Sequence, residues 1–358
     1  MKHFSFLFIA MVLFASCRPG SRDLTLLVGT YTPDNGHGIY TCRFNPSGAH
    51  IEFLDSTASD NPSFLAVSPL TGIVYAVNES GPGSALSSFI TDRETGLIHA
   101  LRRIDNPGAD PCHLAVDPAG RYVVTADYSS GTLTFFNTGS HDILGRVRYA
   151  GSGPDPARQQ APHIHCVVFS PSGEHLFATD LGTDRIYVLK NVRTGIPVPE
   201  QTVVLEPGSG PRHMTFNKSG SRAYLINELS GMVTVFAHRE GKLEQIQSLV
   251  ADTCQARGSA HIALSGDGRF LYASTRLQGD GMVIYSVDPD EGTLTRKGFL
   301  ATGSHPRHFL ITPDDKWVLV SCKNENQIEI YRRNIKTGLL TDTGKRAPVR
   351  QPVCIGIL

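Results

Sequence analysis

Pro111-Cys112-His113-Leu114-Ala115 is one of seven short stretches that begin alike and recur along the chain. The openings of the seven are Pro62-Ser63-Phe64, Pro111-Cys112-His113, Pro162-His163-Ile164-His165, Pro211-Arg212-His213, Ser259-Ala260-His261, Pro306-Arg307-His308 and Pro352-Val353-Cys354. Successive starts lie 49, 51, 49, 48, 47 and 46 residues apart. A repeat of this length with several strand-like segments in each unit is typical of a β-propeller. Residues at one distance from each start then occupy the same place in every blade.

Each unit carries the signals of four antiparallel strands. A short apolar segment after the start leads into a tight turn such as Asp117-Pro118-Ala119-Gly120, where Pro presets φ and Gly tolerates positive φ. A second apolar segment, an alternating segment and a more polar segment complete the unit. No stretch keeps a 3.6-residue apolar period, so we expect almost no helix after the leader. We therefore predict an all-β fold, a seven-bladed β-propeller with four antiparallel strands per blade.

The two ends of the repeat complement each other. The first unit begins at Leu24 with a segment that matches the second strand of the others, and the last start, Pro352 to Leu358, has nothing after it. We expect this C-terminal strand to complete the N-terminal blade and to close the ring, which removes open sheet edges. Deleting the last seven residues should then destabilise the whole ring.

Composition narrows the class of protein. The unbroken repeat assigns residues 24–358 of the 358-residue chain to one propeller domain. Lys plus Arg and Asp plus Glu number 33 each, and a nucleic-acid binder usually shows a basic excess, so we expect no nucleic-acid partner.

The N-terminus reads as an export signal. Lys2 and His3 precede an apolar run from Phe4 to Phe14, which is too short for a stable transmembrane helix, and Ala15-Ser16-Cys17 follows. Small residues before a cysteine resemble a bacterial lipobox, although Phe14 stands where Leu is usual. We predict a signal peptide over 1–17, lipidation of Cys17, a tether over 18–23 and a lipid-anchored protein of the bacterial cell envelope, in the periplasm or at the outer membrane. A plain cleaved signal is the alternative, and we expect no other membrane contact.

Six cysteines remain after Cys17. No pair has the Cys-x-x-Cys spacing of zinc or redox sites, and five of the six lie in or next to predicted strands, where a free Cys behaves as a small hydrophobe. We expect mostly buried free thiols and no metal site.

The residues that open each first strand and end each second strand should meet at one face of the funnel. The second position after the start is His in four of seven units, and we interpret this recurrence mainly as architecture, with a bond to a neighbouring backbone. We nevertheless keep His113, His213 and His308 among the candidate substrate-binding residues.

Irregular charges at regular positions indicate a ligand site. The first position is Ser63, Cys112, His163, Arg212, Ala260, Arg307 or Val353, and His165 shares the side of His163. Charged residues also stand seventeen residues after four starts: Glu79, Glu228, Arg276 and Lys323. Arg captures carboxylate or phosphate, and Glu or His can act as general base. We predict that these residues line one site for an anionic or polyhydroxylated small molecule: His163, His165, Arg212, Glu228, Arg276, Arg307, Glu79 and Lys323. His163, Arg307, Glu79 and Lys323 are candidate substrate-binding residues.

These residues belong to stretches that resemble the lactonase family of seven-bladed propellers, which holds propeller-type 6-phosphogluconolactonases and carboxy-muconate lactonizing enzymes. The resemblance runs from about Leu24 to Leu358, and its specific stretches are Val28-Gly29-Thr30-Tyr31-Thr32, Tyr75-Ala76-Val77-Asn78-Glu79, Pro111-Cys112-His113-Leu114, Ala161-Pro162-His163-Ile164-His165, Asp180-Leu181-Gly182-Thr183-Asp184-Arg185, Gly210-Pro211-Arg212-His213 and Asn227-Glu228-Leu229-Ser230-Gly231. It implies cofactor-free hydrolysis of a sugar δ-lactone, and its proposed catalytic residues map onto His165 (or His163), Arg212, Glu228 and Arg276. Glu228 or His165 would take a proton from water, and Arg212 and Arg276 would stabilise the oxyanion.

Two features bear on the substrate. Many relatives read Ala-Glu-Ile-His where this chain has Ala260-His261-Ile262-Ala263, and an exported enzyme would seldom meet a cytoplasmic sugar phosphate. We therefore expect a non-phosphorylated aldonolactone or a related sugar acid as the partner molecule. The alternatives are a non-catalytic propeller that binds a sugar acid or a protein, and a muconate-type lactonising cycloisomerase.

Overall fold

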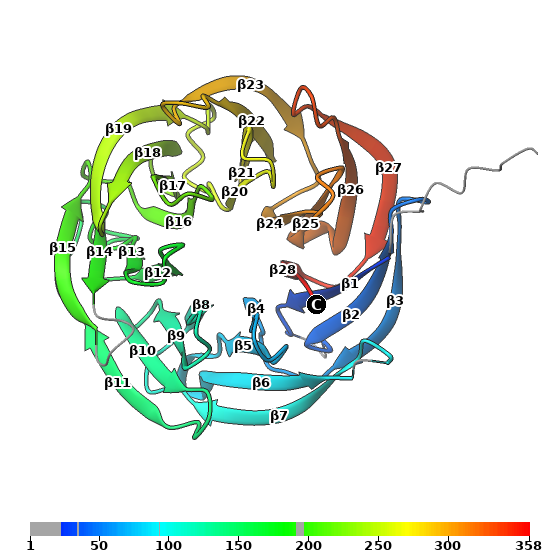
Figure 1. Ribbon diagram of the computed structural model, residues 1–358, viewed down its shortest axis with the longest axis horizontal. Coiled ribbons are helices and arrows are strands. Elements are labelled where there is room, and N and C mark those ends of the chain that lie inside the picture. Colours follow the sequence, from blue (N-terminus) through cyan, green and yellow to red (C-terminus); the bar gives the residue numbers. More distant parts are fainter. Residues whose placement is uncertain (1–22, 34–35, 93, 191–196) are drawn as a thin grey trace, which may run out of the picture.

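Seven four-stranded antiparallel sheets stand around a common axis in the computed structural model, which describes residues 23–33, 36–92, 94–190 and 197–358 (Figure 1). Blade 1 consists of β28 (Pro352–Ile357), β1 (Leu24–Thr30), β2 (Ile39–Asn45) and β3 (His50–Thr57); blade 2 of β4 (Leu65–Val67), β5 (Val74–Asn78), β6 (Ala85–Thr91) and β7 (Ile98–Asp105); blade 3 of β8 (Pro111–Val116), β9 (Tyr122–Asp127), β10 (Thr132–Asn137) and β11 (Ile143–Arg148). Blade 4 consists of β12 (Ile164–Phe169), β13 (Leu176–Asp180), β14 (Arg185–Lys190) and β15 (Val198–Val204); blade 5 of β16 (Pro211–Phe216), β17 (Arg222–Asn227), β18 (Met232–Arg239) and β19 (Lys242–Val250). Blade 6 consists of β20 (Ile262–Leu264), β21 (Phe270–Thr275), β22 (Gly281–Val287) and β23 (Leu294–Ala301); blade 7 of β24 (Pro306–Ile311), β25 (Trp317–Cys322), β26 (Gln327–Arg333) and β27 (Leu340–Pro348).

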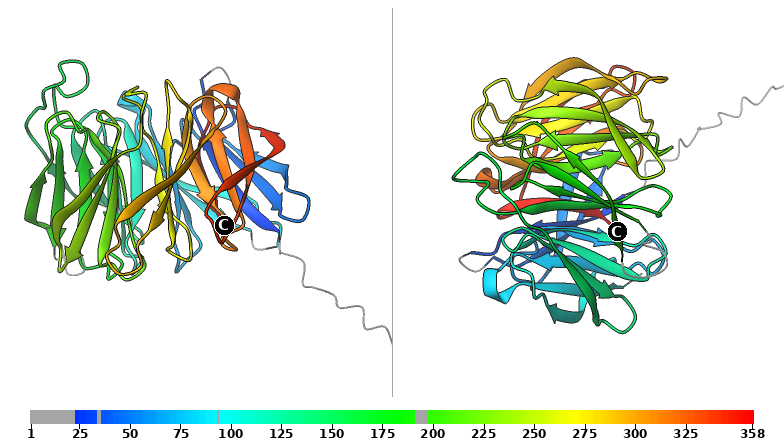
Figure 2. Two further views of the ribbon diagram at one scale, coloured as in Figure 1. Left: turned by 90° about the horizontal axis from the view of Figure 1, so that it is seen from above. Right: turned by 90° about the vertical axis from the view of Figure 1, so that its left-hand side faces the viewer.

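Each blade places its first strand at the axis and its fourth at the rim, so the molecule is a short disc (Figures 1 and 2). In the described residues the helical content is two single 3₁₀ turns, Gly81–Gly83 and Lys323–Glu325. This confirms the predicted seven-bladed all-β fold with almost no helix. The predicted export signal over 1–17 and residues 18–22 of the predicted tether over 18–23 lie outside the described part of the chain.

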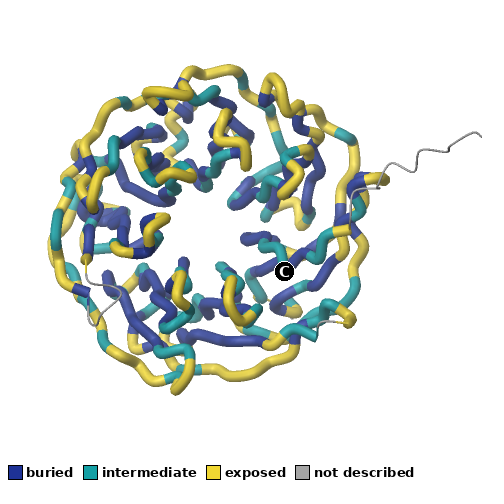
Figure 3. Tube along the Cα trace, in the orientation of Figure 1, coloured by how far each residue is buried: buried dark blue, intermediate teal, exposed yellow. Residues whose placement is uncertain are grey.

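The core is divided among the contacts between blades. Seven clusters of buried apolar side chains lie at the seven junctions between neighbouring blades. The inner and middle strands of each blade are therefore largely buried, whereas most residues of the outer strands are exposed or half-buried (Figure 3). Five of the six cysteines after Cys17 are buried free thiols, and Cys254 is exposed, as the sequence predicted.

The C-terminal strand closes the ring. β28 pairs antiparallel with β1, with Ile355 opposite Val28 and Cys354 opposite Gly29. Ile355 belongs to the apolar cluster between blades 7 and 1, together with Trp317. The predicted closure is thus confirmed, and the effect of deleting the last seven residues stays a prediction.

A single truncation tests how much closure stabilises the ring. We expect Ile355→Ala to lower the free energy of unfolding by about 3 kcal/mol, because Ile355 is 2 % exposed and the cavity cannot collapse between paired strands. Trp317, the only tryptophan of the chain, reports unfolding in denaturant by its fluorescence. Val204→Ala on the exposed strand β15 is the control and should cost less than about 0.5 kcal/mol. Equal effects of the two truncations would contradict a stabilising role for the closing strand.

Candidate active site

One backbone hydrogen bond recurs at the funnel and identifies equivalent residues. The amide of the residue that follows each second strand donates to the carbonyl just before the inner strand. The pairs are Tyr31 to Gln351, Glu79 to Asn61, Tyr128 to Asp110, Leu181 to His163, Glu228 to Gly210, and Lys323 to His305. In blade 6, where β21 ends at Thr275, the equivalent residue is Arg276. We call these seven residues the exit ring: Tyr31, Glu79, Tyr128, Leu181, Glu228, Arg276 and Lys323.

Blade 4 starts two residues later than the Pro162 motif indicates. Ile164 pairs with Asp180, as Pro111 pairs with Asp127 and Pro211 with Asn227. The residue equivalent to Cys112 and Arg212 is therefore His165, and His163 lies before the strand. The Pro162 motif predicted His163 at this first position, and that prediction was wrong.

A β-bulge at the start of the inner strands directs two successive side chains into the funnel. The register shifts between Pro211 and His213, and equivalent shifts occur in blades 3, 4 and 7. Arg212 consequently reaches the exit ring while the next residue, His213, contacts rings at the axis.

The exit ring and the first-position residues enclose a pocket at the mouth of the funnel. Its volume is about 180 Å³. Its walls are Tyr31, Glu79, Cys112, Tyr128, Arg158, His165, Glu228, Arg276 and Arg307. The wall thus consists of five exit-ring residues, three first-position residues and Arg158, which comes from the loop before blade 4.

Glu228 lies among three guanidinium groups. Its Oε2 accepts from Nε of Arg212 at 2.9 Å and lies 3.3 Å from Nη2 of Arg276, and its Oε1 accepts from Nη2 of Arg158 at 2.8 Å. Burial would raise the pKa of this carboxyl, but Arg276 and Arg212 together with His165 and Arg158 hold it well below its usual range. Glu228 is therefore a carboxylate at neutral pH, and its negative charge can stabilise a positive charge that develops beside it.

His165 supplies a neutral imidazole beside this carboxylate. Its Nε2 lies 3.8 Å from Oε2 of Glu228, and its Nδ1 lies 3.7 Å from Sγ of Cys112. Burial, with Arg212 second, lowers the pKa of His165 well below its usual range, although Glu228 opposes the shift. Burial also raises the pKa of the Cys112 thiol well above its usual range, so this thiol is a poor nucleophile.

Arg276 is anchored by its own blade and by the loop that leads into blade 7. Its Nε donates to the carbonyl of Gly258 at 2.6 Å, and its Nη1 donates to Nε2 of His305 at 3.1 Å. Burial lowers the pKa of Arg276 to about 9, against the effect of Glu228, so the side chain stays cationic at neutral pH. Its position in the pocket wall allows it to stabilise negative charge that develops on a bound carbonyl oxygen.

Arg212 lies behind Glu228 and is absent from the pocket wall. Its side chain is buried, with Nε on Glu228 and Nη1 on the carbonyl of Ala260 at 2.6 Å. This placement favours a positioning role over the direct contact with an oxyanion that the sequence analysis assigned to it.

The recurrent histidines meet at the axis below the pocket. We call Phe64, His113, His213, His261 and His308 the imidazole plug. Phe64 stacks on His113 at 3.9 Å between ring centroids, His261 stacks on His308 at 4.0 Å, and Phe64 lies 6.0 Å from His213 although blades 2 and 5 are not neighbours. These ring contacts cross the centre that the ribbon leaves open in Figure 1.

The plug has an architectural role in two blades. Nδ1 of His113 accepts from the amide of Val167 in blade 4, and Nδ1 of His308 accepts from the amide of Ile355 in blade 1. Each imidazole thus bonds the backbone of the next blade, as the recurrence predicted. His113, His213 and His308 do not line the pocket, so the structure does not bring them to the candidate substrate.

The other predicted residues divide into two groups. Glu79 and Arg307 line the pocket, and Lys323 lies 5.7 Å from the Tyr31 ring, which is in the wall. His163 instead stacks on Tyr128 at 4.4 Å and supports the wall from outside. Of the pair left open by the sequence, the structure therefore places His165 at the pocket and His163 behind it.

Four residues line the pocket that were not predicted as site residues: Tyr31, Cys112, Tyr128 and Arg158. Tyr31 follows β1, the second strand of blade 1. The start of that blade lies at the other end of the chain, so no count from a preceding start reaches Tyr31. Arg158 comes from a loop that the buried Gln159 anchors through bonds to the Leu181 carbonyl and to Asp184. Loop residues have no fixed phase in the repeat.

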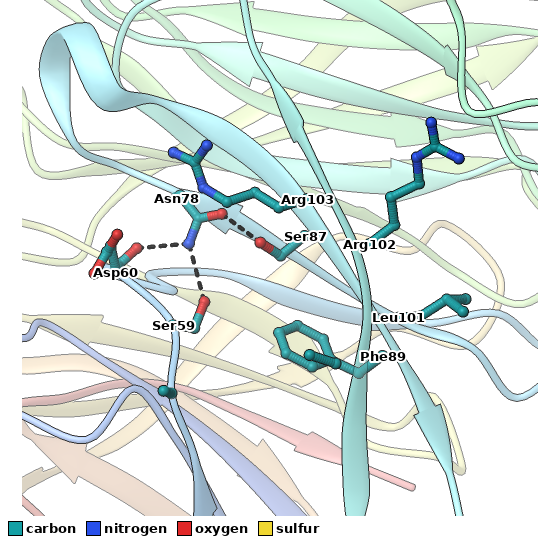
Figure 4. A pocket seen from close by; sticks show the side chains of 10 residues that line it. Ser59, Asp60, Asn78, Ser87, Phe89, Leu101, Arg102 and Arg103 are labelled. Carbon is teal, nitrogen blue, oxygen red and sulfur yellow. Dashed lines mark hydrogen bonds between the residues drawn. The ribbon is translucent and has the colours of Figure 1, made fainter.

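A second pocket, of about 450 Å³, lies between the loop that joins blades 1 and 2 and the face of blade 2 (Figure 4). Asn78 is its central polar group, and it bonds Ser59, the carbonyl of Asp60 and Ser87 (Figure 4). The side-chain amide of Asn78 is thus hydrogen-bonded within the protein. Among the described residues, no three His, Cys, Asp or Glu side chains are arranged to hold a metal ion.

Comparisons with known proteins identify the family to which the chain belongs. A family model described as lactonase, 7-bladed beta-propeller, matches residues 25–357. A 6-phosphogluconolactonase from Formosa agariphila is 34 % identical over 88 % of this chain and 94 % of its own length. A solved structure from Bacteroides fragilis is 44 % identical with a TM-score of 0.90, covering 95 % of this chain and 99 % of that one. The periplasmic gluconolactonase of Pseudomonas aeruginosa is 30 % identical with a TM-score of 0.88, covering 94 % of this chain and 99 % of that one. The chain belongs to the lactonase family of seven-bladed β-propellers.

Proposed function

We propose that this protein hydrolyses a sugar δ-lactone in the pocket at the mouth of the funnel. The observation that carries the proposal is the pairing of a neutral imidazole, His165, with the carboxylate of Glu228 beside the cationic Arg276. Relatives named 6-phosphogluconolactonase and gluconolactonase support the same reaction class.

The groups suit a general-base mechanism. His165 takes a proton from water, and the hydroxyl oxygen forms a bond to the lactone carbonyl carbon. Arg276 stabilises the oxyanion, and Glu228 stabilises the imidazolium through its charge at 3.8 Å. The carbonyl re-forms as the bond to the ring oxygen breaks, and the imidazolium returns its proton to that oxygen. The product is the open-chain hydroxy acid.

The His165→Gln variant tests the base. We expect kcat to fall by about 10²- to 10⁴-fold, because glutamine keeps polar atoms in place but cannot carry the proton. Initial rates of lactone opening in a pH-stat, corrected for spontaneous hydrolysis, measure the change. His50→Gln, on the exposed face of β3, is the control and should keep the parent rate. A His165→Gln enzyme with the parent kcat would remove His165 from the mechanism.

A substrate panel tests the reaction class. Purified protein is assayed on glucono-δ-lactone, on its 6-phosphate and on a carboxy-muconate. Lactone opening faster than in buffer supports the proposal, whereas binding without turnover, or activity on the muconate alone, would overturn it.

Export bears on the choice of lactone. We propose that residues 1–17 direct export, that Cys17 is lipidated, and that the physiological substrate is a non-phosphorylated aldonolactone or a related sugar acid. The similarity to a periplasmic gluconolactonase supports this assignment. A large preference for the 6-phosphate in the panel would overturn it.

A further inference from the structure

The charges around the pocket are unevenly compensated. Five cations stand at or beside it, namely Arg158, Arg212, Arg276, Arg307 and Lys323, against two carboxylates, Glu79 and Glu228. Glu228 contacts three of the five cations. The chain as a whole has zero formal charge, so this excess is local.

Arg307 and Lys323 are the two cations without a carboxylate partner. Among the residues that the structure describes, neither makes an ion pair within 4.0 Å or a side-chain hydrogen bond. Both lie against the ring of Tyr31, with the guanidinium carbon of Arg307 at 5.3 Å and Nζ of Lys323 at 5.7 Å from its centroid. A cation–π contact attracts a cation but satisfies none of its N–H donors.

Two nearby groups, Glu79 and His305, do not neutralise the positive charges of Arg307 and Lys323. Oε2 of Glu79 accepts from the Tyr31 hydroxyl at 2.9 Å, and Glu79 makes no ion pair with Arg307 within 4.0 Å. His305 is neutral, because burial together with Arg276, Arg307 and Lys323 lowers its pKa to about 3. A partly buried guanidinium with unsatisfied donors is costly unless an anion joins it.

We propose that Arg307 and Lys323 form an anion subsite for a second negative group of the substrate, a carboxylate or a phosphate. The subsite lies at blades 7 and 1, whereas Glu228, His165 and Arg276 come from blades 4 to 6. The anionic group therefore sits away from the lactone bond. The inference rests on the proposed function and narrows its substrate class to lactones that carry a second acidic group. The non-phosphorylated substrate proposed above is then a sugar-acid lactone with a free carboxylate, whereas a preference for the 6-phosphate would keep the subsite and overturn that assignment.

Paired kinetics test the subsite. The parent, Arg307→Gln and Lys323→Met are assayed on glucono-δ-lactone, which is uncharged, on its 6-phosphate and on a lactone of glucaric acid. We expect a charged lactone to be the better substrate of the parent. Each variant should lose about 10- to 100-fold in kcat/KM on it, mainly through KM, because charge-assisted hydrogen bonds are lost. The loss on the uncharged lactone should be at least tenfold smaller. Equal losses on charged and uncharged lactones would overturn the subsite.

A binding measurement separates the subsite from catalysis. Calorimetry with gluconate 6-phosphate and with glucarate distinguishes a phosphate group from a carboxylate, and needs no turnover. We expect at least one to bind the parent and to bind Arg307→Gln about tenfold more weakly. Lys297→Met, which removes an exposed lysine of β23, should bind as the parent does. Equal binding by the parent and by a folded Arg307→Gln would overturn the subsite. Anion binding that depends on Arg307, without turnover of any lactone, would overturn the proposed function and leave the subsite standing.

Discussion

Replacing Glu228 with glutamine is expected to lower both the free energy of unfolding, by about 3–5 kcal/mol, and the rate of lactone opening, by about a hundredfold or more. The carboxylate is 6 % exposed and is the anionic partner of Arg158, Arg212 and Arg276. Without its charge, Arg212 and Arg276 stay buried and uncompensated. The rate falls because the imidazolium of His165 loses the charge that stabilises it. Denaturant unfolding followed by Trp317 fluorescence and lactone kinetics measure the two effects.

A second substitution separates these two effects. Arg212→Met in the Glu228→Gln background removes one unpaired buried cation, so we expect it to restore part of the lost stability, since replacing both partners of a buried pair costs less than breaking it. It should not restore activity, because His165 still lacks its anionic partner. Recovery of activity together with stability would show that Glu228 acts only through folding. Glu206→Gln, on the exposed loop after blade 4, is the control and should change neither quantity.

The periodic parts of the molecule could be predicted from sequence because strand pairing repeats. Every blade needs a first strand, a turn and a second strand of nearly fixed length, so a constant count finds Glu79, Glu228, Arg276 and Lys323 at one level of the funnel. The closing strand followed from the same logic, since an opening segment without a successor must pair with a unit that lacks one.

Blade 4 shows where counting from a motif fails. Pro162 resembles the other starts, but the strand begins at Ile164. The signal lay at the other end of the hairpin: sixteen residues after Pro62, Pro111 and Pro211 come Asn78, Asp127 and Asn227, and sixteen before Asp180 comes Ile164. An alignment on these Asn and Asp residues would have given His165 the first position.

Counting residues from the start of each repeat does not identify all the side chains that line the pocket. Arg158 reaches Glu228 from a loop between blades, and Arg212 lies behind Glu228 because its guanidinium also bonds the Ala260 carbonyl. Both placements follow from side-chain packing in three dimensions. The repeat thus predicted which blade residues lie at the mouth of the funnel. The structure was needed to show which of their side chains line the pocket.

Acid is expected to destabilise the folded ring through the imidazole plug. Burial, followed by Arg212, lowers the pKa of His113 and of His308 to about 3. In the unfolded chain these groups titrate at about 6.5, so below that pH the unfolded state binds protons that the folded state does not. The free energy of unfolding therefore falls as the pH drops from about 6.5 toward 3. At pH 5.5 each of the two histidines should cost about 1.4 kcal/mol relative to pH 7.5.

Other buried titratable groups also change the free energy of unfolding over this pH range, so the measurement must separate their effects from those of His113 and His308. His213 and His261 share a contact of 2.9 Å between their Nδ1 atoms, and burial lowers the pKa of both, so they act in the same direction. Burial raises the pKa of Asp127 and Asp180, which stabilises the folded state as the pH falls and opposes the histidines.

A double variant isolates two of the histidines, because every other titrating group is common to it and the parent. In His113→Gln with His308→Gln, glutamine keeps an acceptor for the neighbouring amide but does not titrate. The loss of unfolding free energy between pH 7.5 and 5.5 should be about 2.8 kcal/mol smaller than in the parent, as measured by denaturant unfolding of Trp317. Val204→Ala, which changes no titratable group, should keep the parent's dependence. Because the comparison concerns the change with pH, any packing defect that the glutamines introduce cancels. An identical pH dependence in parent and double variant would show that the plug takes up protons without unfolding, and that the axis is open to water.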